Sequence, residues 1–431
     1  MAAAVRHVRW SREPLAVCEC AIVTTSPDAR LLLITRTIRS FSDGFVSVLL
    51  ASYLAGIGFS DVRIGAIATA TLLGTAIATL LAGAYTDRLG RRRVLAYATL
   101  LAAATGLGLA STEVFVLLLL IAIVGTLNPS AGDVSVFLPV EQAILPQTVD
   151  PAQRTRLFAR YNLFGALAAA TGALFAGVPS LAHRAFEWDQ IDVERAMFVL
   201  YGALALVNFI LYRRLTAAVE VAGVGAVRAP LHRSRGTVLR LAGLFSIDAF
   251  AGGFVVQSIL ALWLFKRYGL STGEAGAIFF AAGICTAFSM LAAARIAERF
   301  GLINTMVFTH LPSNILLILV ALMPNVWLAV LMLLARQSLS QMDVPTRQSY
   351  TMAVVDPDER AAAASVTGVA RSLSSSGSPV IAGALLAATT FGWPLVIAGA
   401  MKSAYDLLLL QQFRSVKPAE EIVAVEPAKS R

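Results

Sequence analysis

The chain has 431 residues, of which 57% are hydrophobic and only 14% are charged, and its mean hydropathy is +0.73. Soluble domains carry about 25% charged residues, so this composition excludes an ordinary soluble enzyme and indicates an all-α polytopic membrane protein. The net charge of +9 would favour nucleic-acid binding in a soluble protein. Here the Arg residues gather in alternate loops, so membrane topology explains them and no nucleic-acid partner is expected.

The apolar sequence divides into twelve predicted transmembrane helices with short connections. A helix needs about 20 residues to cross the hydrocarbon, and twelve of them use most of the chain. The first six are predicted at residues 28–59, 62–84, 94–111, 114–145, 157–181 and 196–212. The second six are predicted at 237–265, 272–298, 302–322, 326–350, 360–387 and 391–412. Residues 183–195 form the most acidic loop, which suits the outer face.

One long basic connection divides the chain nearly in half. Short cytoplasmic loops carry the Lys/Arg excess, so this connection is predicted on the cytoplasmic side. The resulting segments are a cytoplasmic N-terminal segment, a six-helix half, a cytoplasmic central loop, a second six-helix half and a cytoplasmic tail, at residues 1–29, 30–212, 213–236, 237–412 and 413–431.

A short stretch with one Asp and four Arg stands between the second and third predicted helices. Residues 83–93 read Gly-Ala-Tyr-Thr-Asp-Arg-Leu-Gly-Arg-Arg-Arg, with apolar runs on both sides. We expect a tight turn at the cytoplasmic membrane surface. The spacing resembles the signature loop between helices 2 and 3 of the major facilitator superfamily, and the matching residues are Gly83, Asp87, Arg88, Gly90, Arg91 and Arg92.

The resemblance implies twelve helices in two six-helix repeats that rock about a central cavity. It also implies that Asp87 belongs to a cytoplasmic gate. An internal repeat agrees with it: a shift of 211 residues places 86–90 on 297–301 and retains the acid, the Arg and the Gly as Glu298, Arg299 and Gly301.

A second internal match comes from a shift of 206 residues, which places 149–154 on 355–360. Both copies carry Asp-Pro followed by Gln153 or Glu359, so each predicts a helix start with a capping box.

Many ionisable or polar side chains fall inside the predicted membrane helices, where the default interpretation is functional. Arg36, Arg39 and Asp43 are spaced to share one helix face. The resemblance implies that helices 1, 4, 7 and 10 line the cavity. The candidates for solute or proton contact are Arg39, Asp43, Asp133, Asp248, Gln257, His310, Arg336 and Asp343.

Other charged residues have a structural interpretation. Glu141 and Arg347 lie near the inner ends of their helices, so we expect Glu141 to pair with Arg88 or Arg91 and Arg347 with Glu298, as a cytoplasmic gate lock. Lys402 and Asp406 stand four residues apart on one helix and are expected to pair with each other.

Taken together, the sequence predicts a secondary active transporter of an unidentified small solute. We expect proton coupling, export over uptake, and a monomer in the plasma (inner) membrane with both termini cytoplasmic. Its partners are the solute, protons and lipid. No cofactor, metal site or enzymatic activity is expected, since the sequence lacks a phosphate-binding Gly-rich loop and metal-ligand spacing. The alternative is a non-transporting receptor or assembly protein on the same fold.

Overall fold

The computed structural model describes residues 26–129, 135–149, 153–220, 231–356 and 359–413, and this part of the chain is helical without strands. The first half contains α1 (Pro27–Gly56), α2 (Asp61–Leu89), α3 (Arg91–Ser111), α4 (Phe115–Val124), α5 (Phe137–Ile144), α6 (Arg154–Phe175), α7 (Val178–Phe186) and α8 (Gln190–Arg213). The second half contains α9 (Arg235–Gly253), α10 (Gln257–Tyr268), α11 (Thr272–Phe300), α12 (Leu302–Leu322), α13 (Val326–Ser340), α14 (Asp343–Ala353), α15 (Arg360–Ser376), α16 (Ser378–Ala388) and α17 (Trp393–Phe413).

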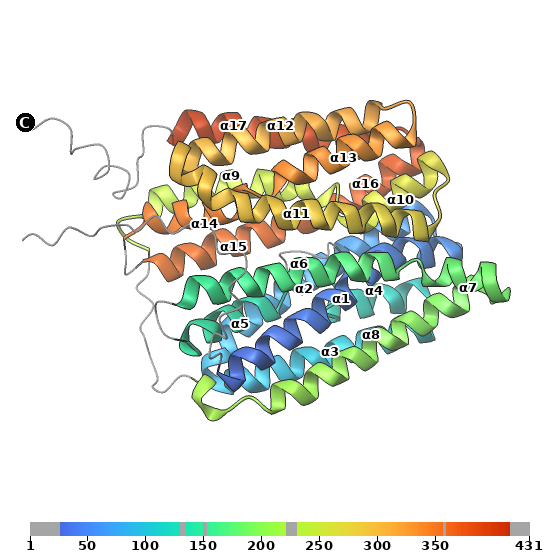
Figure 1. The fold of residues 1–431 in the computed structure, drawn as a ribbon, viewed down its shortest axis with the longest axis horizontal. Helices are drawn as coiled ribbons and strands as arrows, with labels where there is room; N and C mark the ends of the chain where they lie inside the picture. Colours follow the sequence, from blue (N-terminus) through green and yellow to red (C-terminus); the bar gives the residue numbers. More distant parts are fainter. Residues whose placement is uncertain (1–25, 130–134, 150–152, 221–230, 357–358, 414–431) are drawn as a thin grey trace, which may run out of the picture.

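These helices form twelve spans. Eight spans are long and apolar enough to cross a membrane. Two of these eight consist of two consecutive helices each, α6 with α7 and α9 with α10. The other four are the charged helix α1 and the interrupted pairs α4–α5, α13–α14 and α15–α16. Figure 1 shows the first half and the second half as two layers of helices that share one long direction.

The turn with the Arg run is far shorter than the expected loop of residues 83–93. Helix α2 continues to Leu89 and α3 begins at Arg91, so Gly90 alone lies outside the helices. Gly83 lies inside α2, and nothing comes within 4 Å of a Cβ built on it. Arg88 and Arg93 are exposed and Arg91 and Arg92 are half-buried, and all four lie on helical backbone, so their charge does not require an irregular loop.

The repeat is confirmed in the backbone of the turns. Gly90 has φ 88° and ψ 144°, and Gly301, between α11 and α12, has φ 82° and ψ 163°. An L side chain is strained at such positive φ values. The membrane face that carries these two turns is called the loop face below, and the opposite one the far face.

Four predicted continuous helices are broken. The fourth span stops at Gly125 and resumes at Phe137, the seventh breaks between Gly253 and Gln257, and the tenth breaks at Gln341–Met342. The eleventh is interrupted at Gly377, just before Pro379. Gly and Pro weaken the backbone hydrogen-bond ladder, and interrupted helices are tolerated where they line a cavity.

The expected acidic loop of residues 183–195 is also corrected. Helices α7 and α8 leave only Glu187 to Asp189 between them, and α8 starts at Gln190. Glu194 is therefore a helical residue, 1% exposed, and it accepts hydrogen bonds from Ser52 and Gln190 at 2.7 and 3.0 Å.

The two halves meet in the far part of the membrane. On the far face Asp61 of α2 forms an ion pair with Lys266 of α10, and Ser52 Oγ lies 3.0 Å from Thr272 Oγ1. Helices α2 and α16 approach so closely that a Cβ on Gly383 would lie 2.3 Å from the Asp61 carbonyl oxygen. Between helices of the two described halves, the side-chain contacts near the loop face do not include a comparable ion pair.

Candidate functional site

A cavity of about 770 Å³ lies between the halves. Its walls come from α1, α2, α5 and α6 on one side and from α9, α11, α14, α15 and α17 on the other. Gln142, Met352 and Ala364 line it at positions no more than four residues from the loop-face ends of their helices. The cavity therefore extends toward the loop face, whereas the far face is closed.

Asp248 of α9 is the centre of the charge on the second-half wall. Its side chain is buried, and its Oδ1 lies 2.5 Å from Lys402 Nζ. Its Oδ2 lies 3.0 Å from Arg371 Nη1 and 3.3 Å from Arg347 Nη1. Arg347 also bonds Asp343 at 2.8 Å. These five residues are called the Asp248 cluster below, and all except Asp343 line the cavity.

One expected pairing is corrected by this cluster. Lys402 bonds Asp248 and not Asp406. Arg347 bonds Asp248 and Asp343, and its expected pairing with Glu298 stays a prediction, because the Glu298 side chain lies outside the described part of the structure. The reason is positional: α17 and α14 turn these cations toward α9, where a buried carboxylate needs compensation.

Behind Asp248 lies a second buried acid, Asp406 of α17, bonded to His310 of α12. The His310 Nδ1 is 3.0 and 3.1 Å from the two Asp406 oxygens, and Asn314 donates to Asp406 at 2.8 Å. The His310 Nε2 is 4.0 Å from Asp248 Oδ1. The imidazole therefore stands between two carboxylates, one of which reaches the cavity.

The other two candidates of the second half, Arg336 and Gln257, make no hydrogen bond or ion pair with Asp248 within the described part of the chain. Arg336 donates to Gln337 at 2.6 Å, and its buried Nε has no hydrogen-bond partner among the described residues. Gln257 is the half-buried first residue of α10 and does not line the cavity.

In the first half, Glu141 of α5 is fully buried and bonds Arg39 of α1 through both carboxylate oxygens, at 2.6 and 3.0 Å. The Tyr212 hydroxyl donates to it at 2.6 Å, the Tyr161 hydroxyl also donates to it, and Arg39 stacks on Phe137 at 4.5 Å. These five residues are called the Glu141 cluster below.

The Glu141 cluster corrects the expected gate lock. Glu141 faces α1 and α8, and its partner is Arg39 rather than Arg88 or Arg91. Arg88 is exposed, and Arg91 instead donates to Gln147 at 3.0 Å and to the Val219 carbonyl at 3.2 Å. A buried carboxylate takes the cation that is buried with it.

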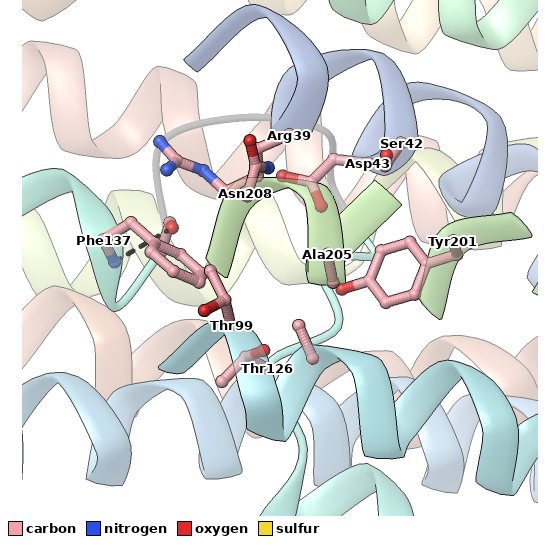
Figure 2. Close-up of a pocket in the computed structure, with 11 residues that line it drawn as sticks. Arg39, Ser42, Asp43, Thr99, Thr126, Phe137, Tyr201, Ala205 and Asn208 are labelled. Atoms are coloured by element: carbon pink, nitrogen blue, oxygen red, sulfur yellow. Dashed lines mark hydrogen bonds between the residues drawn. The ribbon is translucent and has the colours of Figure 1, made fainter. Parts of the chain in front are cut away.

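The face of α1 that carries Arg36, Arg39 and Asp43 divides between two cavities. Arg39 and Asp43 line a small polar cavity of about 20 Å³ inside the first half, together with Tyr201 and Asn208 (Figure 2). That volume holds about one water molecule. Arg36 instead lines the large cavity. Asp133 lies outside the described residues.

Arg36 was on the predicted face but not among the candidates, and Lys402 and Arg371 were also missed. Arg36 lies over the Tyr161 ring at 5.1 Å, and it makes no hydrogen bond within the described part of the chain. A Cβ on Gly165 would lie 2.5 Å from the Arg36 Nε, so this glycine leaves the room in which Arg36 lies. The signal that could have identified all three was a charged side chain inside a predicted span.

The signature residues hold the ends of the connection between the halves. Glu220 accepts from the backbone N–H groups of Arg91 and Arg92, at 2.7 and 3.2 Å, and the Arg92 side chain donates to the Arg213 carbonyl. The negative carboxylate offsets the unfavourable Arg run at the α3 N-terminus. Arg299 is exposed over Phe300, and the Asp87 side chain lies outside the described part.

In the second half, Glu359 binds backbone N–H groups of the connection between the halves, as Glu220 binds those of α3. A capping box was expected at Glu359. Its carboxylate accepts from the backbone N–H groups of His232, Arg233 and Ser234, each at 2.9 Å. Burial opposes ionisation, but these three donors outweigh it and hold the pKa of Glu359 at about 2. The nearby Pro357 and, in the first copy, Asp150 and Pro151 lie outside the described residues.

The family described as the Major Facilitator Superfamily matches residues 32–379 and 242–426. The chain belongs to the major facilitator superfamily. This confirms the resemblance and the twelve-helix fold, and it makes the chain a membrane solute transporter rather than an enzyme. A relative from Saccharomyces cerevisiae, the uncharacterized membrane protein YJR124C, is 26% identical over 426 residues, and the match covers 91% of this chain and 95% of that protein.

Solved superfamily structures share the fold at low sequence identity. A bacterial homologue of the human lysosomal transporter Spinster, inward-facing and occupied, gives a TM-score of 0.70 at 16% identity, covering 90% of this chain and 97% of that one. The inward-open xylose transporter XylE from E. coli gives 0.69 at 15%, covering 92% and 99%. The human organic anion transporter MFSD10 gives 0.63 at 15%, covering 89% and 99%.

Proposed function

We propose that the chain is a proton-coupled secondary active transporter that works by alternating access. The moving bodies are the two halves, residues 30–212 and 237–412. The closed far face and the cavity that extends to the loop-face helix ends support this proposal. Opening the far face requires breaking the Asp61–Lys266 pair and separating α2 from α16, while the loop-face ends close.

The observation that carries proton coupling is the row Asp248, His310 and Asp406. Asp248 lines the cavity, where solute and water reach it, and His310 lies 4.0 Å behind it. Asp406 holds the other side of the imidazole. Histidine readily exchanges protons near neutral pH, so a proton arriving at Asp248 has a relay deeper in the half. Protonation of Asp248 would release cations that then bind solute.

The orientation follows from the positive charge at the loop face. Arg91 to Arg93, Arg213 and Arg214 all lie there, so we propose that this face is cytoplasmic in the plasma (inner) membrane. Helix α1 begins and α17 ends at the same face, which puts both termini in the cytoplasm. The cavity is built by one chain, which supports a functional monomer.

The test uses the full chain in proteoliposomes loaded with a mixed pool of sugars, nucleosides, amino acids, amines and carboxylates. Mass spectrometry identifies what leaves when a pH gradient is applied in either orientation. We expect gradient-dependent movement of at least one solute, lost in Asp248→Asn, and the orientation that supports it distinguishes export from uptake.

Two results would contradict the proposal. If the folded protein moves no solute in either orientation, the chain is a receptor or assembly protein rather than a transporter. If Asp248→Asn moves the same solute at the same gradient-dependent rate, the proton site is not Asp248.

A further inference from the structure

The cavity wall carries more positive than negative charge. The four cations Arg36, Arg347, Arg371 and Lys402 line it, and within the described residues Asp248 is the carboxylate that lines it with them. Asp343, behind Arg347, compensates one more charge. Two positive charges remain unmatched. Further back, Arg39 balances Glu141 and Arg336 balances Asp406 in the charge count, which leaves this excess unchanged when His310 is neutral. Asp43, on the same helix as Arg36, lowers it to one when ionised, so the described charges still leave the site positive.

Arg36 supplies one of these positive charges, and its guanidinium is positioned to bind a ligand. Packing on Tyr161 and over Gly165 fixes its position, and its guanidinium has no hydrogen-bond acceptor in the described structure. A guanidinium binds carboxylate or phosphate through two parallel hydrogen bonds. A cation held in place without an acceptor costs solvation energy that an anionic ligand recovers.

Arg371 faces the cavity from the opposite half. Its side chain is 27% exposed and shares Asp248 Oδ2 with Arg347, so only part of its hydrogen-bonding capacity is used. Arg36 belongs to α1 and Arg371 to α15, so an acidic group that contacts both would connect the two halves.

The rest of the wall suits an organic body. Leu72, Leu138, Phe245 and Met290 line the cavity, and its volume of about 770 Å³ lies within the range of about 300–1,000 Å³ typical of small-molecule sites. The excess charge repels organic cations, and a neutral solute, although its oxygens can accept hydrogen bonds, would leave the positive charge uncompensated.

We propose that the solute is a small organic anion whose carboxylate or phosphate group binds Arg36 and Arg371. This proposal rests on the proposed transport function and names its substrate class. Displacing Asp248 from Arg371 as the anion binds would link solute binding to the proton site.

The test measures binding to the purified full chain in nanodiscs with four aromatic probes of similar size. Phthalate and phenyl phosphate are anions, phthalamide is neutral and benzyltrimethylammonium is a cation. At constant ionic strength, we expect one or both anions to raise the unfolding temperature, and the other two probes to leave it unchanged. The two anions distinguish a carboxylate from a phosphate solute.

Variants locate the site. Arg36→Gln and Arg371→Gln should each weaken anion binding by about tenfold or more, the value of one lost charge-assisted hydrogen bond. Gly165→Ala should weaken it less, because the methyl group displaces Arg36 without removing its charge. Arg240→Gln removes an exposed Arg of α9 outside the cavity and is the matched control, with unchanged binding expected.

Circular dichroism and gel filtration of each variant exclude misfolding as the cause, and Gly165→Ala keeps every charge if Arg36→Gln does not fold. Equal stabilisation by the cation, no stabilisation by either anion, or anion affinity unchanged in Arg36→Gln would overturn the inference. The transport proposal can fail separately. If anions bind through Arg36 but no solute crosses the bilayer, the anion site is retained and the transport proposal is rejected.

Discussion

The two halves of the molecule use buried charge in opposite ways. In the first half, Glu141 is enclosed by Arg39, Tyr161 and Tyr212, and neither it nor Arg39 lines the large cavity. In the second half, Asp248 collects three cations on the cavity wall itself. Both are buried carboxylates paired to Arg, yet only Asp248 lines the large cavity.

The difference teaches that access to the cavity, and not burial alone, separates an enclosed structural charge from the proposed transport site. In the Glu141 cluster both carboxylate oxygens are paired, and the cluster ties α1, α5, α6 and α8 into one body. The Asp248 cluster has excess donors facing a cavity, so a ligand or proton can change its pairing. Arg36 is the exception, a first-half cation on the shared wall.

The largest expected effect comes from breaking the enclosed cluster. Glu141→Ala leaves Arg39 buried without its carboxylate and should lower the free energy of unfolding by about 3–5 kcal/mol. Denaturant unfolding in detergent micelles measures it. Glu113→Ala, which removes a partly exposed ion pair with Arg195, should cost no more than about 1 kcal/mol.

A double variant sharpens this test. Arg39→Met combined with Glu141→Leu should cost less than Glu141→Ala alone, because no unpaired charge remains. A loss from Glu141→Ala no larger than that from Glu113→Ala would end the claim that the first-half cluster is structural.

The next effect concerns function rather than stability. Asp248→Asn should reduce proton movement per solute to background, and it should lower the unfolding free energy by about 1–3 kcal/mol, less than Glu141→Ala, because cavity water solvates the released cations. A pH-sensitive dye inside proteoliposomes reports the protons. Asp192→Asn, on the exposed far face, is the control with full coupling. If proton coupling persists in Asp248→Asn, the claim that the Asp248 cluster serves transport is wrong.

A smaller effect is expected at the contact between the halves. Asp61→Asn removes the ion pair with Lys266 and should favour the far-face-open state by roughly 1 kcal/mol, a population change of about fivefold. Spin labels at the exposed positions Trp188 and Trp327 report the distance distribution across that face. Glu113→Gln breaks an ion pair within the first half, so an equal change there would show that the Asp61 effect is not specific to the interface.

The smallest effect concerns pH at the loop face. The pKa of Glu359 falls from an ordinary 4.5 to about 2 because its carboxylate accepts three backbone N–H groups. Its contribution to stability is complete above pH 4.5 and is lost as the pH falls toward 2. Hydrogen exchange at residues 232–234, corrected for intrinsic rates, should therefore show constant protection from pH 5 to 8.

Glu359→Gln should reduce that protection while leaving the transport pH profile between 5 and 8 unchanged. Glu274→Gln removes a carboxylate that caps α11 and is the matched control. Loss of protection between pH 7 and 5 in the unchanged protein would assign the titration to another group.

The sequence by itself determined the spans, the family and the turn glycines. Hydrophobic length sets which segments cross a membrane, and Gly90 and Gly301 are required by a backbone conformation that side chains disfavour. The periodicity of α1 also indicated which buried charges share a helix face.

Only the tertiary structure decided how those charges pair. Lys402 stands four residues from Asp406 yet bonds Asp248, and Arg36 and Arg39 lie three residues apart yet line different cavities. Periodicity gives the direction of a side chain relative to its own helix. The partner depends on the rotation, depth and breaks of the neighbouring helices, which are set by packing across the whole chain.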